Sequence, residues 1–460
     1  MVRVFRKSGT WVLAALMTLQ SGVVAPGFAQ TKKRTGPSII RDAEIEGLMR
    51  LYSRPVFKAA GINPGSVRVY LISDPGINAF VAGGQRIFIN TGLLTKAPAP
   101  NMVIGVIAHE TGHIAGGHLA RMGIELDRAG TAAIIGALLG AAAMVGGAVA
   151  GSEGTAKAGQ GVLLGSQGLA QRSVLAYARA MEASADQAAL KYLTATRQSA
   201  RGMIGLFQKL SNDSIASAQN VDRYVMSHPM PADRVQNLQE AAEKSPYYDA
   251  PDSKDMLLRH KLMQAKLIGF LEPAAVVFQK YPKSDNSVSG RYARSIAMLL
   301  RGDTKNAVAV IDTLIKDMPQ NPYFWELKGQ ALLEGGQPAA AITPLRKSVE
   351  MIPTNGLVRI LEAQALVATE QPGNAKAAIA TLRQAQKTEN DTPALFKTMA
   401  QAYGLLGDVP RADLATAEFA WLTGDKDLAT RKAKAAAEKF KKGTPEWLRA
   451  NDILNSAGRK

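Results

Sequence analysis

The sequence contains no cysteine, and this absence excludes several kinds of site. A chain without cysteine has no disulfide framework, no cysteine-ligated zinc ribbon, no iron–sulfur cluster and no thiol nucleophile. Histidine is also scarce, with five residues in 460. A catalytic metal in this chain must therefore be held by histidines and carboxylates. Three of the five histidines, His109, His113 and His118, lie within ten residues of one another, and we expect function there.

The overall composition excludes a disordered or collagen-like polymer. Hydrophobic residues make up 47% of the chain and charged residues 20%, which is typical of globular proteins. A length of 460 residues leaves room for two or three domains with their own cores. The chain is therefore expected to fold into several domains.

The first 29 residues predict a cleaved secretory signal peptide. Three basic residues precede an apolar stretch from Trp11 to about Val24, and small residues lead to a cleavage site after about Ala29. A retained membrane anchor is the alternative. The apolar stretch is shorter than the ~20 residues that span a bilayer, which disfavours an anchor.

Removal of these basic residues lowers the formal net charge from +17 to +14. Strong basicity alone suggests nucleic acid as a partner, but an exported protein seldom meets it. We therefore expect an anionic membrane surface or acidic clients as partners, and no nucleic acid. Export into an oxidising compartment also fits a chain without free thiols.

The segment that follows predicts helices and a small sheet. Apolar residues at helical spacing predict a helix over residues 40–60. The β-branched and aromatic runs at 67–73 and 86–90 predict strands joined by Gly and Pro turns. A proline-rich break then precedes a long helical pattern with the histidine cluster, and a second amphipathic helix is expected over 173–193.

Residues 131–151 are nearly uncharged, and their length suggests a transmembrane span. Alanine and glycine supply most of the bulk, however, and these residues partition weakly into a membrane. We therefore expect a buried or mobile helical hairpin that could touch a membrane or a partner. An integral-membrane protein is the alternative.

Beyond residue 246 the sequence predicts tetratricopeptide repeats. Pro319 and Pro353 are 34 residues apart. The frame ending at Pro353 has the large, small and breaker positions of such a repeat, occupied by Trp325, Gly329, Leu332, Ala341 and Pro353. Two neighbouring frames are degenerate, and an irregular helical bundle is the alternative. A repeat array offers a concave surface, which favours a binding platform over catalysis.

His109, Glu110 and His113 form an HExxH motif inside an apolar helical pattern. Histidines four residues apart lie on one face of a helix, so both imidazoles can reach a single Zn²⁺. Glu110 then lies beside the open coordination position. Two ordinary core histidines are the structural alternative.

Glu182 and Asp186 also stand four residues apart, in a stretch with few acids. A catalytic zinc needs a third protein ligand and an open fourth position. One carboxylate of this pair suits the metal, and the second suits a hydrogen bond to a ligand histidine. A solvated acidic face is the alternative.

These motifs resemble those of the gluzincin metalloendopeptidases of the HtpX and CAAX prenyl protease type. Residues 78–94 are similar to the strand and turn before the family's zinc helix, and residues 227–234 to its later His-Pro…Arg motif. The resemblance implies one Zn²⁺ per chain. It implies that His109, His113 and Glu182 are the zinc ligands and that Glu110 is the general base.

An oxyanion that develops at the scissile carbonyl needs a second electrophile besides the metal. His228 or Arg234 could supply it, and Tyr177 is a weaker candidate. The resemblance also allows a different role for His228, as an occupant of the metal's fourth position that keeps the enzyme inactive. The remaining histidines are expected to have lesser roles, with His118 outside the ligand set and His260 at the surface.

The strands at 80–90 offer a further possibility, because an edge strand beside a zinc helix can bind an extended substrate by strand addition. A purely structural sheet edge is the alternative.

The expected fold is mainly α with a small β-sheet in an α+β zincin-like protease domain, followed by an all-α tetratricopeptide-repeat solenoid. We expect a signal peptide at 1–29, a linker at 30–39, a zinc metalloprotease domain at 40–245 and the repeats at 250–460.

The leading hypothesis is a periplasmic zinc metalloendopeptidase for misfolded or stalled envelope proteins, in outer-membrane quality control and assembly. Its repeats would hold outer-membrane assembly machinery or a client, and peripheral membrane contact is a further expectation. A chaperone or scaffold with a mostly latent protease site and an integral-membrane protease are the alternatives.

Overall fold

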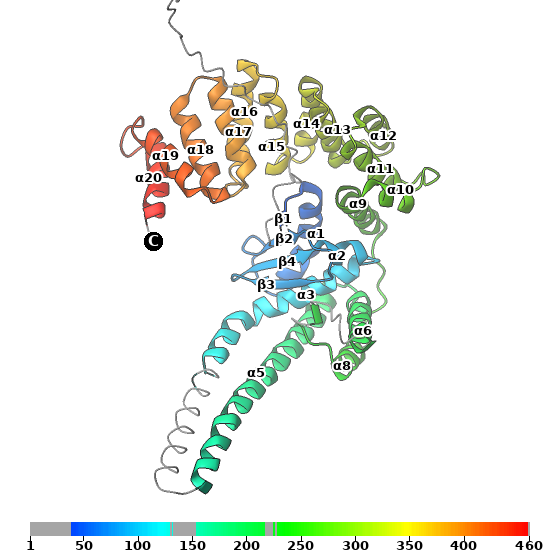
Figure 1. The fold of residues 1–460 in the computed structure, drawn as a ribbon. Coiled ribbons are helices and arrows are strands. Elements are labelled where there is room, and N and C mark those ends of the chain that lie inside the picture. Colours follow the sequence, from blue (N-terminus) through cyan, green and yellow to red (C-terminus); the bar gives the residue numbers. More distant parts are fainter. Residues whose placement is uncertain (1–37, 129–130, 132–152, 217–223, 226–227, 459–460) are drawn as a thin grey trace, which may run out of the picture.

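The computed structural model describes residues 38–128, 131, 153–216, 224–225 and 228–458 (Figure 1). The expected signal peptide at 1–29, all but the last two residues of the expected linker at 30–39, and nearly all of the apolar segment at 131–151 lie outside these residues. Within the part that is described, no helix is long and apolar enough to cross a membrane.

A four-stranded mixed sheet forms the centre of the N-terminal part. Its strand order is β1-β2-β4-β3, with β2 and β4 parallel and the other two pairings antiparallel. The strands are β1 (Ile39–Ile40), β2 (Arg68–Ile72), β3 (Ala79–Ala82) and β4 (Arg86–Asn90). The strands predicted at 67–73 and 86–90 are thus confirmed, and β3 forms one edge of the sheet.

Alternation along the strands gives the sheet two different faces. Leu71, Ile87 and Ile89 are fully buried in the main core. On the opposite face, Tyr70 and Phe80 each stack on Phe88 with ring centroids 5.2 Å apart. The β-branched and aromatic residues that predicted strands therefore also supply the packing on both faces.

Helices cover the buried face of this sheet. They are α1 (Ala43–Ala59), α2 (Thr91–Lys96), α3 (Pro100–Ala115), α5 (Glu153–Ala195), α6 (Arg201–Ala216) and α8 (Ala232–Ala242). Asp42 caps α1 by accepting a hydrogen bond from the backbone N–H of Ile45 at 2.9 Å. Helix α5 projects from the sheet on the side opposite the C-terminal helices (Figure 1). The helices predicted at 40–60 and 173–193 are confirmed as α1 and the second half of α5.

A glycine brings α3 and α5 close together at the histidine cluster. A Cβ atom on Gly112 would lie 2.8 Å from the backbone oxygen of Ala185, too close for any other residue. Gly112 lies between the two histidines of the motif, and Ala185 lies between Glu182 and Asp186. The close approach of the two backbones therefore sets the distance between the histidines and the carboxylates.

The C-terminal region is all helical and has the arrangement of a helical-repeat solenoid (Figure 1). Its helices are α9 (Lys254–Leu271), α10 (Ala274–Lys280), α11 (Val288–Leu300), α12 (Thr304–Asp317), α13 (Pro322–Glu334), α14 (Pro338–Met351), α15 (Gly356–Val367), α16 (Pro372–Ala385), α17 (Pro393–Leu405), α18 (Val409–Thr423), α19 (Lys426–Ala437) and α20 (Pro445–Gly458). The frame ending at Pro353 corresponds to α13 and α14. A Cβ on Gly329 would lie 2.3 Å from the Leu345 side chain, so this small position lets the two helices pack. The predicted fold class is confirmed.

The solenoid contacts the N-terminal part at the start of α1. Lys266 of α9 lies 2.8 Å from Asp42, and the Tyr292 hydroxyl donates a hydrogen bond to Glu44 at 2.7 Å. Farther along the solenoid, Arg41 donates to Glu389 in the turn between α16 and α17 at 2.6 Å. The beginning of α1 is therefore held by charged and polar groups from two places in the solenoid.

Candidate metal centre

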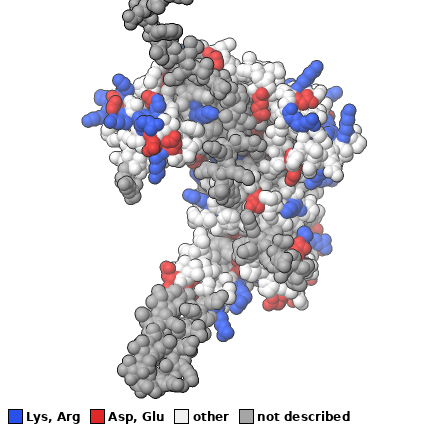
Figure 2. Space-filling view, in the orientation of Figure 1, with Lys and Arg blue, Asp and Glu red and all other residues white. Residues whose placement is uncertain are grey.

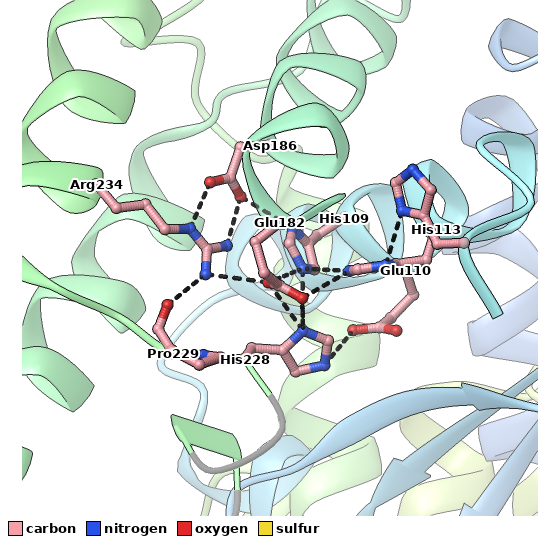
Figure 3. Close-up of polar contacts among 9 residues, drawn as sticks. His109, Glu110, His113, Glu182, Asp186, His228, Pro229 and Arg234 are labelled. Carbon is pink, nitrogen blue, oxygen red and sulfur yellow. Dashed lines mark hydrogen bonds and ion pairs between the residues drawn. The ribbon is translucent and has the colours of Figure 1, made fainter. Parts of the chain in front are cut away.

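Two histidines of α3 and one carboxylate of α5 converge on a single point (Figure 3). The Nε2 atoms of His109 and His113 lie 3.1 Å apart. Glu182 places one carboxylate oxygen 3.4 Å from His109 Nε2 and the other 3.3 Å from His113 Nε2. The four-residue spacing on each helix thus produces the shared face that the sequence predicts.

His228 joins this group from the segment before α8. Its Nδ1 lies 3.0 Å from Glu182 Oε1 and 3.4 Å from His109 Nε2. One ligand atom from each of the four side chains lies within 4.8 Å of the others. The side chains of His109, Glu182 and His228 are almost completely buried. Among the described residues, this is the one group of histidines and carboxylates that could hold a metal ion.

The surroundings of His109 favour a cation between these groups. Its Nδ1 lies 3.0 Å from Asp186 Oδ1, a contact that favours a proton on Nδ1. Although burial opposes it, the carboxylates of Asp186 and Glu182 raise the pKa of His109 to about 10, which favours a second proton on Nε2. A metal ion on Nε2 can replace that second proton beside the same carboxylate. The donor set therefore fits a metal.

Asp186 and Arg234 form a second layer behind the ligand atoms. The Arg234 guanidinium donates to both oxygens of Asp186, at 2.7 and 2.9 Å, and lies 3.0 Å from Glu182 Oε2. It also donates to the backbone carbonyl of Pro229 at 2.7 Å. Burial alone would raise the pKa of Asp186, but Arg234 and His109 outweigh it and the pKa is lowered. Arg234 therefore helps to hold Asp186 in its charged form and fixes the residue that follows His228.

Glu110 lies on α3 beside the converging atoms and is completely buried. His228 Nε2 lies 3.5 Å from Glu110 Oε1. Burial raises the pKa of the Glu110 carboxyl, although the nearby charges of His228 and His109 act in the opposite direction. A carboxylate whose pKa is moved toward neutrality is suited to accept and release a proton.

The structure places the remaining histidines differently from one another. His118 Nδ1 lies 3.0 Å from His113 Nδ1, behind a candidate ligand and outside the converging group. The surface location expected for His260 is wrong, because only 1% of this residue is exposed. Its ring contacts the Tyr52 hydroxyl at 3.2 Å and the Ala97 carbonyl at 2.9 Å. The neighbours of His260 in the sequence are charged and exposed, but His260 itself is buried because α9 packs against α1 and α2.

Tyr224 and Tyr177 differ in their relation to the site. The ring of Tyr224 is fully buried and packs on His228 with centroids 4.6 Å apart. No motif includes Tyr224, so the sequence provided no signal for it. Tyr177 lies on α5 ahead of Glu182, and among the described residues it forms no hydrogen bond or ion pair with the site.

A family model agrees with this geometry. The model of peptidase family M48 matches residues 44–242, which include all of α1 except its first residue, the strands β2 to β4 and every residue of the candidate centre. The chain contains a peptidase family M48 domain. The protein is therefore a metallopeptidase, and the converging side chains lie inside its M48 domain.

Similarity to curated proteins extends beyond the M48 domain. The chain is 23% identical to the beta-barrel assembly-enhancing protease of Yersinia pestis over 443 residues, which cover 95% of this chain and 88% of that protein. It is 21% identical to the beta-barrel assembly-enhancing protease of Escherichia coli K12 over 387 residues, 83% of this chain and 76% of that protein. Both matches extend into the solenoid, so the similarity is not confined to the M48 domain.

Proposed function

We propose that this protein is a periplasmic zinc endopeptidase that hydrolyses misfolded or stalled envelope proteins during outer-membrane protein assembly. The convergence of His109, His113 and Glu182 on one point, with Glu110 beside it, carries this proposal. The names of the relatives support the process, because both are beta-barrel assembly-enhancing proteases.

The donor set supports zinc as the metal. Two imidazole nitrogens and one carboxylate suit Zn²⁺, whereas Mg²⁺ and Ca²⁺ prefer oxygen ligands alone. We assign His109 Nε2, His113 Nε2 and the Glu182 carboxylate as ligands of one ion per chain. When bound, Zn²⁺ polarises a carbonyl and lowers the pKa of water.

The protein side chains then carry the proton. We assign Glu110 as the general base that removes a proton from the attacking water and as the acid that donates it to the leaving amine. Its burial and raised pKa support this role. Asp186 and Arg234 hold His109 and Glu182 in position. The contacts of Arg234 favour this positioning role over the oxyanion role that the sequence also allowed.

We propose that His228 occupies the fourth position at the metal in the resting protein. Its Nδ1 lies among the ligand atoms, which supports this role over stabilisation of an oxyanion. A site closed in this way is inactive until His228 moves. The alternative of a chaperone or scaffold with a mostly latent protease rests on this same contact.

Extended substrates would bind along the free edge of β3. This strand pairs with β4 on one side, and no other described strand pairs with it. Helix α3, which carries Glu110, packs against β3, and this supports a substrate strand beside the assigned general base. Strand addition relies on main-chain hydrogen bonds, so it suits unfolded clients of varied sequence. The solenoid would recruit such clients or the assembly machinery itself.

A Glu110→Gln variant tests this proposal. The variant keeps all metal ligands, so we expect zinc to remain bound while cleavage of an unfolded protein such as casein is lost. The same variant should fail to complement an outer-membrane defect in cells that lack the wild-type protein. Full complementation by the inactive variant would show that proteolysis is not its main task and would favour the scaffold.

A further inference from the structure

Exposed aliphatic side chains gather at one edge of the solenoid, near its C-terminal end. The turn between α17 and α18 and the turn between α19 and α20 lie on the same edge, because each joins the first helix of a pair to the second. At the helix ends beside these turns, the exposed fraction is 38% for Leu405, 60% for Val409 and 49% for Leu448.

An ion-pair bridge holds these two turns side by side. Arg411 lies 2.8 Å from Asp408 in the first turn and 3.2 Å from Glu446 after the second turn. Val409 follows Asp408 directly, and Leu448 is two residues beyond Glu446. The bridge therefore keeps the two turns, and the helix ends that carry the exposed aliphatic side chains, side by side.

Lysines flank the aliphatic residues on the same edge. The turn between α19 and α20 carries Lys439, Lys441 and Lys442, all exposed. Within the described residues, none of these three side chains forms an ion pair or a hydrogen bond. Figure 2 shows Lys and Arg side chains over the C-terminal end of the solenoid, interspersed with Asp and Glu side chains. We call the whole group the turn patch, and its members are Leu405, Val409, Lys439, Lys441, Lys442 and Leu448.

We propose that the turn patch binds the surface of a bilayer that contains anionic phospholipids. Aliphatic side chains on protruding turns can enter the headgroup region while neighbouring lysines attract anionic headgroups. The two contributions act together, and neither alone gives stable membrane binding. The charge complementarity between these lysines and anionic headgroups favours a lipid surface. This inference rests on the proposed envelope location but not on peptidase activity.

Vesicle flotation of the full chain tests the inference. We expect binding to vesicles of phosphatidylcholine mixed with phosphatidylglycerol and little binding to phosphatidylcholine alone. Replacement of Lys439, Lys441 and Lys442 by Gln should weaken binding by about 100-fold, because each lysine near an anionic surface contributes about fivefold. A Val409→Ser, Leu448→Ser variant should lose the binding that persists at high salt.

A control variant removes the same charge at the other end of the solenoid. Lys261, Lys280 and Lys283 are exposed on or near α9 and α10, and their replacement by Gln should leave flotation unchanged. Equal loss in both triple variants would contradict the proposal, since it would show a response to net charge. A turn-patch variant that floats like the wild type would also contradict the proposal, even if this variant no longer binds an acidic peptide. Casein cleavage, measured on the same samples without vesicles, should be equal in the wild type and all variants. Absence of cleavage in the wild type would count against the peptidase proposal and would leave the flotation result unaffected.

Discussion

Two buried clusters of charged groups in this protein differ in where their side-chain cation lies. In the candidate metal centre, His109, His113, Glu182 and His228 place one ligand atom each within 4.8 Å of the others, and the cation of Arg234 pairs with Glu182 and Asp186 from outside this group. In the second cluster, the ammonium of Lys266 itself lies between three carboxylates. It is 2.8 Å from Asp42, 3.4 Å from Glu44 and 3.8 Å from Glu326.

This difference separates a functional cluster from a structural one. Buried histidines and carboxylates that converge on one point can exchange a proton for a metal ion. Buried groups that complement one another need no ligand, and those around Lys266 join α9 and α13 to the start of α1. We therefore expect changes in the first cluster to alter metal binding and activity, and changes in the second to alter stability.

The largest effect is expected for His113→Ala. Loss of a ligand should abolish zinc binding and lower casein cleavage by about 10³-fold or more, because the metal supplies several kcal/mol of transition-state stabilisation. The unfolding free energy measured without zinc should change by less than about 1 kcal/mol, since His113 is only partly buried and its protonation is disfavoured. Added zinc should stabilise the wild type against urea and leave the variant unchanged. A large loss of stability without zinc would remove the contrast with the Lys266 cluster.

Lys266→Met should have the largest effect on stability. This change leaves Asp42, Glu44 and Glu326 buried without a cation, which should lower the unfolding free energy by about 3–5 kcal/mol. Zinc content should stay at one ion per folded chain. Lys328→Met is the matched control, because Lys328 pairs at 2.6 Å with Asp312, which is exposed. The control should cost less than about 1 kcal/mol in the same urea titration.

A smaller effect on metal binding is expected for Asp186→Asn. Asp186 does not face the metal but fixes His109, so zinc affinity should fall by about 10- to 100-fold. Competition with a chelating dye measures this affinity on folded protein. Asp233→Asn, at an exposed position on α8, serves as the control. Unchanged affinity in the Asp186 variant would mean that the contact with His109 does not orient this ligand.

The smallest effect is a pH dependence in the Lys266 cluster. Burial raises the pKa of Glu326 to about 7, although Lys266 opposes this shift and Asp42 and Glu44 add to it. A carboxyl with a raised pKa in the folded state favours folding at low pH, and this contribution is lost as the pH rises from about 4.5 to about 7. Glu326→Gln should therefore gain about 2 kcal/mol in unfolding free energy relative to wild type between pH 5 and pH 8. For the control Glu350→Gln, at an exposed site, the difference in unfolding free energy from wild type should not change with pH. A difference that is equally independent of pH for Glu326→Gln would contradict the predicted titration.

The sequence predicted most of what depends on local spacing. Regular helical spacing brought His109 and His113 to one face of α3, and the apolar runs at 67–73 and 86–90 became β2 and β4. The fold class was also predictable, because the 34-residue spacing of Pro319 and Pro353 reflects one packed pair of helices.

Contacts between distant segments could not be read from the sequence. His260 looks exposed from its neighbours but lies under α1 and α2, because the solenoid packs there. Nor does any motif show that Tyr224 packs on His228, or that Lys266 meets carboxylates more than two hundred residues earlier. These contacts depend on how the two parts of the chain meet, which spacing within one helix does not encode.

The central claim is that the converging donors of the M48 domain bind zinc. Anomalous diffraction at the zinc absorption edge, from crystals of the full chain grown with zinc, tests it most directly. We expect one strong peak at bonding distance, about 2.0–2.3 Å, from His109 Nε2, His113 Nε2 and the Glu182 carboxylate. The absence of a peak there, or a peak held by other residues, would contradict the account.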